Sequence, residues 1–527
     1  MFSSNFSNFN NMKKNNFRLI YASLLILLTG MVSCSKSFTE KKPINAPTDA
    51  NFWNNEGDAT GAVAGAYGLL RASLNEMSMA YYYYGDLNTD EFVVRPNGED
   101  YPSLTGIQFS TFVAPSQTFR GLIKMRRWDN FYRAIDQENR CLKFIPPIPL
   151  TSFTSTDKQG AKNSMIGEAY FLRAFTYFYI SRVWGDVPLV TETAQDAATV
   201  PNTPRTPQAQ VLDQCVKDIQ EAVKYLTWVP NYSANRPIKA NKGACYALLA
   251  HIYAWKGEYD KVAPAADSVI LNGGYTYVAK GSKAAYIGMY KGNSTESIFE
   301  ISQNTTTEGA YITPGYGDIV NPIAARTLKP PYIPITSTAT SLFTLDVPAL
   351  SAQFPDGPDS VDLRRKNGFD FWGTTDPICI KYSNIVYTGA NNTLPVSVNN
   401  IVIFRLADIK LLKAEALAAT NKPGDARTIV NEIRALANLG PTAVADADMF
   451  AGVIDERGRE LFLEGHRYYD LIRLAKKTGV LKFNGSGAVV RMDAATFAQG
   501  KYYWPVEPIL ISLNPLLTQT PYWADKM

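Results

Sequence analysis

Apolar residues recur every three or four positions along much of this chain, the spacing that places side chains on one face of an α-helix. The segment 161–184 shows this most clearly, with the apolar series Met165, Ala169, Leu172, Phe175, Tyr179 and Val183. The same spacing predicts further helices over 57–74, 128–144, 208–226, 240–255 and 259–271. We therefore expect a mainly α-helical fold.

Two of these helices, 240–255 and 259–271, form the two-helix pattern of a tetratricopeptide repeat, a unit of roughly 34 residues with small side chains where its helices cross. A second pair of the same kind extends from Leu411 to Arg434. Such units cannot bury their apolar faces alone, so they stack on one another. The interval between the pairs, about 275–400, is loop-rich and holds one convincing strand at 297–302. We expect it to form a large lobe packed on the helical scaffold.

The segment 85–125 also lacks periodicity and is rich in Gly, Pro, Asn, Ser and Thr, which predicts long loops. Long loops within compact domains usually have a function. We therefore expect a single domain over 57–527. Its helical frame is predicted over about 57–84, 126–272 and 405–480, and its loop-rich ligand lobe over about 85–125 and 275–400.

A last helix is predicted from Ile454 to Arg467, with an apolar face that continues to Ile472. Gly458 and Gly465 lie on that face, although each glycine costs a helix about 1 kcal/mol relative to alanine. Their presence predicts a close approach of another helix at this face.

The N-terminal segment has the order of a secretory signal: basic residues from Lys13 to Arg18, an apolar run over 19–28, small residues, and then Cys34. The apolar run is too short to cross a bilayer, which takes about 20 residues. Residues 31–34 look like a bacterial lipoprotein cleavage site. We predict a signal peptide over 1–33, acyl chains on Cys34 and a polar tether over 34–56. An ordinary secretory peptide with an incidental cysteine is the alternative.

The charge of the chain argues against polyanionic partners. The formal net charge is +4, and it falls by three when Lys13, Lys14 and Arg18 leave with the signal. A chain so near neutrality is not expected to bind nucleic acid or to hold lipid headgroups electrostatically. Membrane attachment should therefore depend on the acyl chains.

The number and spacing of the cysteines and histidines argue against disulfides, zinc sites and histidine-based catalysis. Cys141, Cys215, Cys245 and Cys379 show no CxxC spacing, and we predict small buried side chains in preference to disulfides. The chain has two histidines, His251 and His466, and neither has a second His or Cys at ligand spacing. Zinc chemistry and histidine-based triads are not expected. We predict no catalytic residue, metal or cofactor.

Several short motifs follow one another along the chain. They are Phe52-Trp53 with Ala66-Tyr67, WDNFYRAID at 128–136, EAYFLRA at 168–174, WGDVPL at 184–189, RLAD at 405–408, the segment 456–471, and YWPV at 503–506 with NPLL at 514–517. In this order they resemble the motifs of the SusD/RagB family, the outer-membrane nutrient-binding lipoproteins of Bacteroidota. The resemblance covers essentially the whole chain after the signal.

The resemblance implies a frame of tetratricopeptide units with a loop-rich lobe that carries the ligand site. It also implies a partner, a SusC-like TonB-dependent transporter, to which such proteins deliver glycans or sometimes peptides without catalysing a reaction. The location it implies is the outer membrane, with the lipid-anchored protein facing the cell exterior. The sequence Ser35-Lys36-Ser37 after Cys34 lacks the acidic residues that are often linked to surface export in these bacteria.

Glycan sites combine aromatic platforms with planar hydrogen-bonding groups, because sugar rings present apolar C–H faces and many hydroxyls. Loops after the first helix often contribute to the site in the family, and here the loop 92–101 has this mixture. The candidate ligand residues are Arg95, Asn97, Asp100, Tyr101, Tyr311, Tyr316, Tyr332 and Trp372. For the residues of 92–101 the alternative is an ordinary solvated loop with a packed tyrosine, and for the other four it is packing beneath a long loop.

Other conspicuous residues are predicted to be structural. The run Tyr81–Tyr84 should be mainly core, and the carboxylates of 354–362 favour a solvated turn over a calcium loop, since the EF-hand order is absent. A role in maintaining the fold is predicted for the charged motif residues Glu168, Arg173, Glu415, Glu456, Arg457 and Arg467.

Two other functions remain open from the residues alone. A surface-anchored glycoside hydrolase needs only two carboxylates, but no pair stands out at a strand end. A repeat scaffold that binds only proteins fits the repeats but leaves the large lobe unexplained.

Overall fold

The structure is a computed structural model that describes residues 49, 51–75, 80–94, 100–194, 200–228, 236–303, 310–311, 327–333, 343–354, 361–392 and 394–527. The segment Trp53–Met527 forms one compact unit. The predicted signal peptide, Cys34 and most of the predicted tether lie outside the described residues. Among the residues described, no helix combines the length and apolar character needed to span a bilayer.

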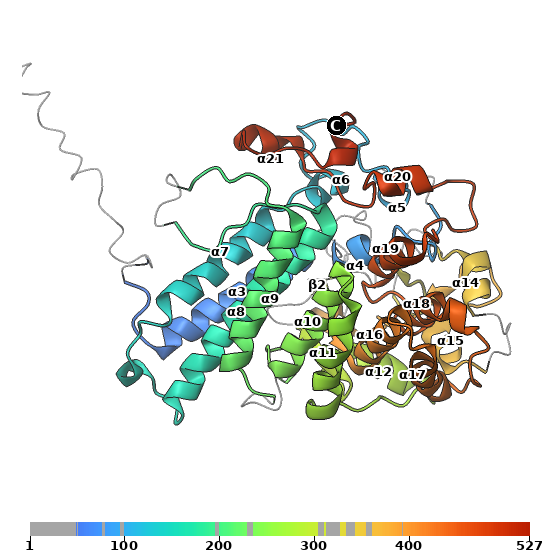
Figure 1. Cartoon of the computed structure of the whole chain (residues 1–527), viewed down its shortest axis with the longest axis horizontal. Helices are drawn as coiled ribbons and strands as arrows, with labels where there is room; N and C mark the ends of the chain where they lie inside the picture. Colours follow the sequence, from blue (N-terminus) through green and yellow to red (C-terminus); the bar gives the residue numbers. More distant parts are fainter. Residues whose placement is uncertain are drawn as a thin grey trace, which may run out of the picture. The chain divides into compact units, whose positions relative to one another are not determined.

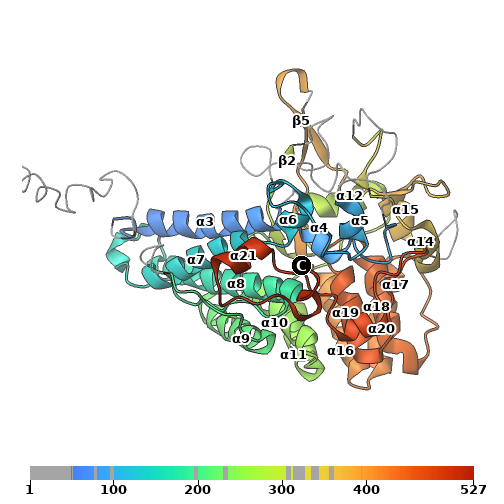
Figure 2. The same ribbon diagram turned by 90° about the horizontal axis from the view of Figure 1, so that it is seen from above.

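The first half of the frame is a row of long helices that pack side by side (Figures 1 and 2). They are α3 (Glu56–Leu74), α7 (Asp129–Phe144), α8 (Lys158–Trp184), α9 (Gln208–Tyr225), α10 (Lys242–Lys256) and α11 (Tyr259–Asn272). The helices predicted from periodicity in this region are thereby confirmed. The longest, α8, begins where the Asp157 side chain accepts a hydrogen bond from the Gly160 N–H at 2.8 Å, a typical N-cap. It ends at Gly185, whose φ is +76°.

The second half of the frame contains α16 (Leu406–Ala419), α17 (Pro423–Leu436), α18 (Met449–Glu460) and α19 (Arg467–Thr478). The two predicted tetratricopeptide pairs, α10–α11 and α16–α17, stack directly because α11 packs on α16. Their shared core is built mainly from small side chains: Ala250, Ala254, Val262, Ala265, Leu412 and Ala416. The stacking shows that the long interval between the pairs leaves the scaffold and returns to it.

The interval leaves and returns through one antiparallel strand pair. β1 (Ser297–Ile301) pairs with β7 (Ile401–Arg405), so that Ser297 lies opposite Arg405 and Ile301 opposite Ile401. The strand predicted at 297–302 is therefore confirmed. Between them, β5 (Ile385–Thr388) pairs with β6 (Leu394–Ser397), which pairs with β2 (Ala310–Tyr311), and β3 (Phe369–Asp370) pairs with β4 (Ile378–Cys379). In Figure 2, β2 and β5 lie on the side opposite α9 and α11.

The remaining elements are short, as expected for loop-rich segments. The helices are α4 (Ala80–Gly85), α5 (Tyr101–Thr105), α6 (Gly121–Met125), α12 (Lys283–Gly288), α14 (Val347–Gln353), α15 (Leu363–Gly368), α20 (Ala494–Ala498) and α21 (Pro508–Leu513). Single 3-10 turns occur at Leu150–Ser152, Met289–Lys291, Ala390–Asn392, Asp446–Asp448 and Pro521–Trp523.

Two predictions about the core are confirmed. All four tyrosines of α4, Tyr81–Tyr84, are buried. The cysteines Cys141, Cys215, Cys245 and Cys379 are buried free thiols, and burial raises the pKa of the Cys141 thiol to about 12.

The continuous helix predicted from Ile454 to Arg467 is wrong. The chain breaks between α18 and α19, where Leu463 and Gly465 have φ values of +55° and +79°. A Cβ on Gly465 would lie 2.2 Å from Cε1 of Tyr81, which leaves no room for a side chain. Two hydrogen bonds fix this contact: the Tyr81 hydroxyl donates to the Glu464 carbonyl at 3.1 Å, and the Gly465 N–H donates to Asp86 Oδ2 at 2.6 Å. The close approach predicted at this glycine exists, and its partner is the short helix α4.

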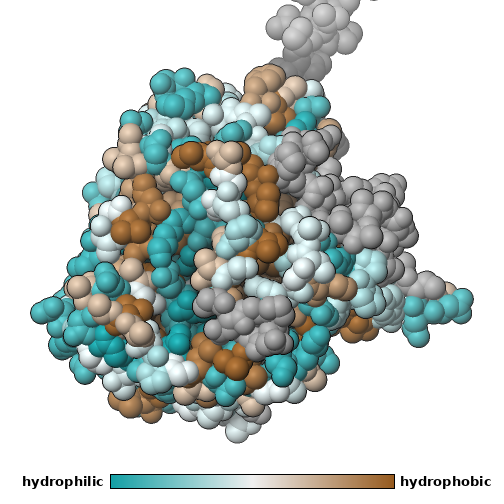
Figure 3. All heavy atoms as spheres, turned by 90° about the vertical axis from the view of Figure 1, so that its right-hand side faces the viewer, coloured by the Kyte–Doolittle hydropathy of each residue, from teal (hydrophilic) through white to brown (hydrophobic). Residues whose placement is uncertain are grey.

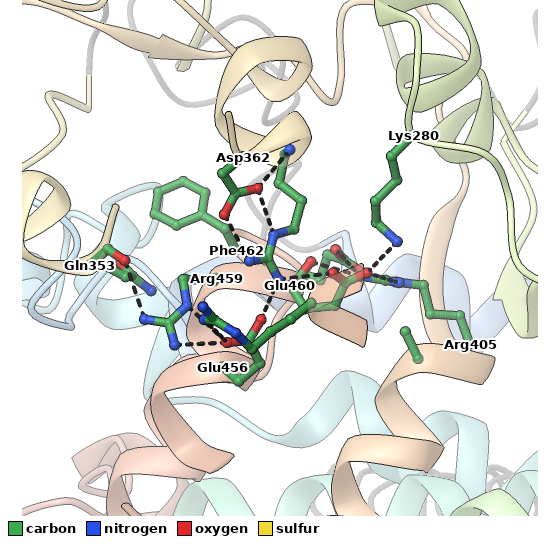
Figure 4. Close-up of polar contacts among 12 residues, drawn as sticks. Lys280, Gln353, Asp362, Arg405, Glu456, Arg459, Glu460 and Phe462 are labelled. Carbon is green, nitrogen blue, oxygen red and sulfur yellow. Dashed lines mark hydrogen bonds and ion pairs between the residues drawn. The ribbon is translucent and has the colours of Figure 1, made fainter. Parts of the chain in front are cut away.

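Buried ion pairs join the lobe to the frame around three glutamates of α18 and the break that follows it (Figure 4). Arg405 reaches Glu460 at 3.0 Å and Glu464 at 2.7 Å. Three cations of the lobe form the pairs Lys280–Glu460 (2.9 Å), Arg364–Glu456 (2.7 Å) and Lys381–Glu464 (2.6 Å). Although burial alone would raise the pKa of Glu464, the charges of Arg405 and Lys381 lower it to about 2.

The charged motif residues are largely structural, as predicted. Arg173 pairs with Asp218 at 2.7 Å, Glu415 with Arg473 at 2.7 Å, and Arg467 with Asp90 at 2.6 Å. Arg457 bridges Asp408 and Asp470, both at 2.9 Å. These pairs connect elements distant in sequence, instead of bracing single helices. Glu168 is the exception and is discussed below.

Candidate functional site

A group of half-exposed aromatic residues lies on the lobe. Tyr332, Phe371 and Trp372 are each partly buried and pack against the main core. The Tyr332 hydroxyl donates a hydrogen bond to the Asp370 carboxylate, two residues before Trp372. The structure therefore pairs one predicted ligand residue, Tyr332, with Asp370, a carboxylate that the sequence analysis did not single out and that lies two residues before a second one, Trp372. We call Tyr332, Asp370, Phe371 and Trp372 the aromatic cluster.

The position of the Trp372 ring is fixed from several sides. Phe369 and Phe354 meet it edge to face, with centroid distances of 5.5 and 6.3 Å. The Arg365 guanidinium lies 4.2 Å from the centre of the Trp372 ring. A ring held in this way loses little conformational freedom when a ligand packs on it, which favours binding.

The backbone of the cluster has an unusual conformation. Phe371 has a φ of +56° and the following Gly373 a φ of +86°. Positive φ is rare for a bulky residue, and such strain is found preferentially at functional sites. The turn is closed by Thr374, whose hydroxyl donates to the Phe371 carbonyl at 2.7 Å. Lys329 lies 4.2 Å from the centre of the Phe371 ring.

Asp370 is the charged acceptor of the cluster. Burial alone would raise its pKa, but the hydrogen bond from Tyr332 and the charge of Lys283, 3.3 Å away, hold the pKa below its usual value. Burial and the same carboxylate raise the pKa of the Tyr332 hydroxyl. At neutral pH the cluster therefore offers a carboxylate beside a protonated phenol, and carboxylate oxygens accept hydrogen bonds from hydroxyl groups.

Asp100 and Tyr101 have structural contacts in this structure. Each is only 7% exposed. Asp100 forms an ion pair with Arg120 at 2.6 Å and accepts a hydrogen bond from the Leu122 N–H at 3.0 Å. The Tyr101 ring meets Phe343 edge to face at 5.2 Å. Both side chains stabilise the loop, and little of their surface remains for a ligand.

Of the four other predicted ligand residues, the structure describes one, Tyr311. Arg95, Asn97 and Tyr316 lie outside the described residues, as do residues 355–360 of the carboxylate-rich loop. Asp362, at the end of that loop, is buried, caps α15 and pairs with Arg364 at 2.8 Å. Tyr311 belongs to β2, where its backbone pairs with Val396.

The face of the molecule that carries α14 and α15, at the right of Figure 1, has hydrophobic side chains scattered among hydrophilic ones (Figure 3).

The sequence did not predict three residues of this site or beside it, namely Asp370, Phe371 and Lys283. The run Phe369-Asp370-Phe371-Trp372 could have indicated the first two, because it places one acidic residue among three aromatic ones. Lys283 is far away in sequence and gave no such signal.

The two histidines, by contrast, meet in the core. His251, Asp408 and His466 bring ligand-type atoms within 4.8 Å of one another. Asp408 Oδ2 lies 2.8 Å from His251 Nε2, and Arg457 donates to Asp408 Oδ1 at 2.9 Å. Both carboxylate oxygens are therefore engaged, and a guanidinium charge stands beside them. Burial lowers the pKa of His466 to about 4, so this ring is neutral at pH 7. The arrangement is that of a buried polar network connecting helices.

Comparisons with known proteins agree with this architecture. The model of the SusD family matches residues 370–523, and a second model, described as starch-binding associating with outer membrane, matches residues 99–254. A SusD-like protein, P38, from Formosa agariphila is 27% identical over 97% of this chain and 100% of its own length.

Solved structures show the same fold. A SusD homologue from Bacteroides thetaiotaomicron has a TM-score of 0.74 and 24% identity, covering 90% of this chain and 99% of the homologue. A laminarin-binding SusD-like protein has a TM-score of 0.67 and 19% identity, covering 89% of this chain and 99% of that protein.

The fold is thus that of a tetratricopeptide-like helical scaffold with a separate loop-rich lobe. The chain belongs to the SusD/RagB family.

Proposed function

We propose that this chain is a lipid-anchored glycan-binding protein of the bacterial cell surface, which captures oligosaccharides and passes them to a TonB-dependent transporter without catalysing a reaction. The aromatic cluster carries the proposal. It joins half-exposed rings, suited to the C–H faces of sugars, with a fixed carboxylate that can accept hydrogen bonds from sugar hydroxyls. The starch-binding description of the second family model and the laminarin-binding relative support a glucan as the ligand.

The electrostatics of the cluster argue against a hydrolase. A glycosidase needs one carboxyl group whose pKa is raised, so that it can protonate the leaving oxygen. The pKa of Asp370 is lowered instead. Its charge and position suit the binding of hydroxyl groups. A peptide ligand remains the alternative in the same role, but no relative described above is named for one.

We expect Trp372→Ala to weaken glycan binding. Loss of a fixed indole ring should lower the affinity for soluble starch or laminarin oligosaccharides about tenfold, or roughly 1.4 kcal/mol. Titration calorimetry on the chain from residue 34 onward, with Cys34→Ser so that no lipid is attached, measures the affinity. The same samples, analysed for reducing ends, should release no product.

Trp228→Ala provides a matched control for that variant. Trp228 is also a half-exposed tryptophan stacked on a ring, Tyr246 at 5.5 Å, but it follows α9 in the frame. Its loss should leave glycan binding unchanged. Equal affinities of the Trp372→Ala and Trp228→Ala proteins would overturn the assignment of the site, and release of sugar products would overturn the assignment of the function.

The transporter partnership predicts a stable complex in the outer membrane. When the chain is tagged at its C-terminus and extracted from its native membrane in mild detergent, a SusC-like TonB-dependent transporter should co-purify with it. A Cys34→Ala chain, which has no thiol for acylation, should move from the membrane fraction to the soluble fraction. Purification of the anchored chain alone, or an unchanged location of Cys34→Ala, would contradict this part of the proposal.

A further inference from the structure

A pocket lies against the helical frame, and none of its lining residues comes from the aromatic cluster. Its volume is about 800 Å³, within the usual size range of small-molecule sites. One face of α3, from Thr60 to Arg71, and one face of α8, from Ala161 to Glu168, form its two long walls, and segments 238–240 and 300–302 complete it.

Glu168 gives this pocket a buried hydrogen-bond acceptor. The residue is only 2% exposed. Its Oε1 accepts a hydrogen bond from the Ser164 hydroxyl at 3.0 Å. The Tyr67 hydroxyl is a second and weaker donor to the group, since no hydrogen bond of ordinary distance and angle reaches Oε2 among the residues that the structure describes. Arg173, five residues later in the same helix, shows the contrast, since its guanidinium is held by Asp218 at both 2.7 and 2.8 Å.

Burial raises the pKa of the Glu168 carboxyl group, and it outweighs the charge of Lys239 and the hydrogen bonds from the Ser164 and Tyr67 hydroxyls, which lower the pKa. The Tyr67 hydroxyl accepts a hydrogen bond from the Ala240 N–H at 2.9 Å and keeps its own hydrogen for the carboxyl group. Since a carboxylate has about four lone-pair sites, a donor that enters the pocket would still find a site on Glu168 that these two hydroxyls do not use.

The walls indicate what the rest of a ligand would be. Val63, Met165, Ile238 and Ile301 supply apolar surface, and Tyr67 is the single aromatic residue among the lining residues described. Such a pocket lacks the opposed rings that would hold a sugar. At the end of the pocket formed by the start of α3, hydrogen bonds from Ser155 and Thr154 lower the pKa of Glu56 to about 2, so that end carries a negative charge.

We propose that this pocket binds a small amphipathic molecule whose apolar body lies between α3 and α8 and whose hydroxyl or ammonium head donates a hydrogen bond to Glu168. This site is independent of the glycan site, and the inference does not rest on the proposed glycan function. Ammonium and hydroxyl heads share the required donor, and a charged carboxylate head lacks it.

Three six-carbon probes test the head group. Hexylamine, hexanol and hexanoate each have six carbons and apolar tails of nearly equal length, so they differ chiefly at the head. Saturation-transfer NMR and titration on the chain from residue 34 onward, with Cys34→Ser, should show binding of the first two at pH 7 and much weaker binding of hexanoate. Probe concentrations up to about 10 mM cover the affinity expected for ligands of this size.

Glu168→Gln should reduce the affinity for hexylamine and hexanol about tenfold, because its amide replaces an acceptor oxygen with a donor. Glu221→Gln, an exposed residue of α9, is the matched control and should bind like the wild type. The Glu168→Gln protein should unfold at the same temperature as the wild type or a higher one, since the variant removes a carboxyl group whose charge is disfavoured by burial.

A second variant narrows the pocket without touching the carboxyl group. Ala161→Leu adds apolar volume to the α8 wall, and it should abolish binding of both donor-headed probes while glycan binding stays unchanged. Wild-type affinity of the Glu168→Gln protein, equal binding of hexanoate, unchanged probe binding by Ala161→Leu, or no binding of any probe would each overturn the proposal.

Discussion

Replacing Arg405 with methionine should lower the free energy of unfolding by about 3–5 kcal/mol, the cost of leaving buried charge without its partner. Arg405 is 1% exposed and reaches Glu296, Glu460 and Glu464 at 2.6, 3.0 and 2.7 Å. Glu460 and Glu464 keep their lysine partners in the variant, but the carboxylate of Glu296 loses the cation that pairs with it here. Urea denaturation, with the midpoint and slope both fitted, measures the loss.

Arg127→Met is the control for this experiment. Arg127 pairs with Asp129 at 2.8 Å, but both side chains are about one-third exposed, at 34% and 33%. An exposed pair of this kind contributes about 0–1 kcal/mol. If the two variants lost the same stability, the buried network of Figure 4 would not be what joins the lobe to the frame.

The second large effect is expected at the break between α18 and α19. Gly465→Ala should destabilise the protein by roughly 2–5 kcal/mol, the sum of the left-handed backbone penalty and of overpacking. The new methyl group would lie 2.2 Å from the Tyr81 ring. It would push α4 away from the break and strain the bond between the Gly465 N–H and Asp86.

Gly479→Ala separates the two contributions. Gly479 follows α19 with a φ of +76°, close to the +79° of Gly465, but no atom lies within 4 Å of its hypothetical Cβ. This control should lose only the backbone term, about 1 kcal/mol. Thermal or chemical unfolding of both proteins gives the difference. If the two variants lost the same free energy of unfolding, the Tyr81 ring would have to move aside for the new methyl group without measurable cost.

The helical frame was predictable because its signal is local. Residues such as Leu172 and Phe175 repeat at helical spacing, and that spacing alone determines which face is buried. The break at 461–466 was not predictable in the same way. Its apolar residues keep helical spacing, and only the approach of Tyr81, almost four hundred residues earlier, explains why the chain turns there. Long-range packing here overrides a local pattern.

The candidate site was predictable only in part, because residue type does not reveal exposure. Tyr101 and Tyr332 both lie in loops, yet Tyr101 is buried against Phe343 while Tyr332 remains half-exposed beside Asp370. Nothing in the sequence near either residue distinguishes them. The pairing of Tyr332 with Asp370 depends on how two separate loops fold onto the scaffold, and periodicity contains no information on that.

The pairing of β1 with β7 has a consequence for how such a protein can diversify. Because the chain leaves the scaffold at β1 and returns beside it at β7, the two ends of the lobe are held together at the scaffold. Insertions or deletions within 302–400 can therefore alter the candidate ligand surface while α11 still packs on α16, provided that Arg364 and Lys381 keep their buried partners Glu456 and Glu464. With these two cations retained, the lobe of one relative could be exchanged for that of another at this strand pair to transfer its specificity.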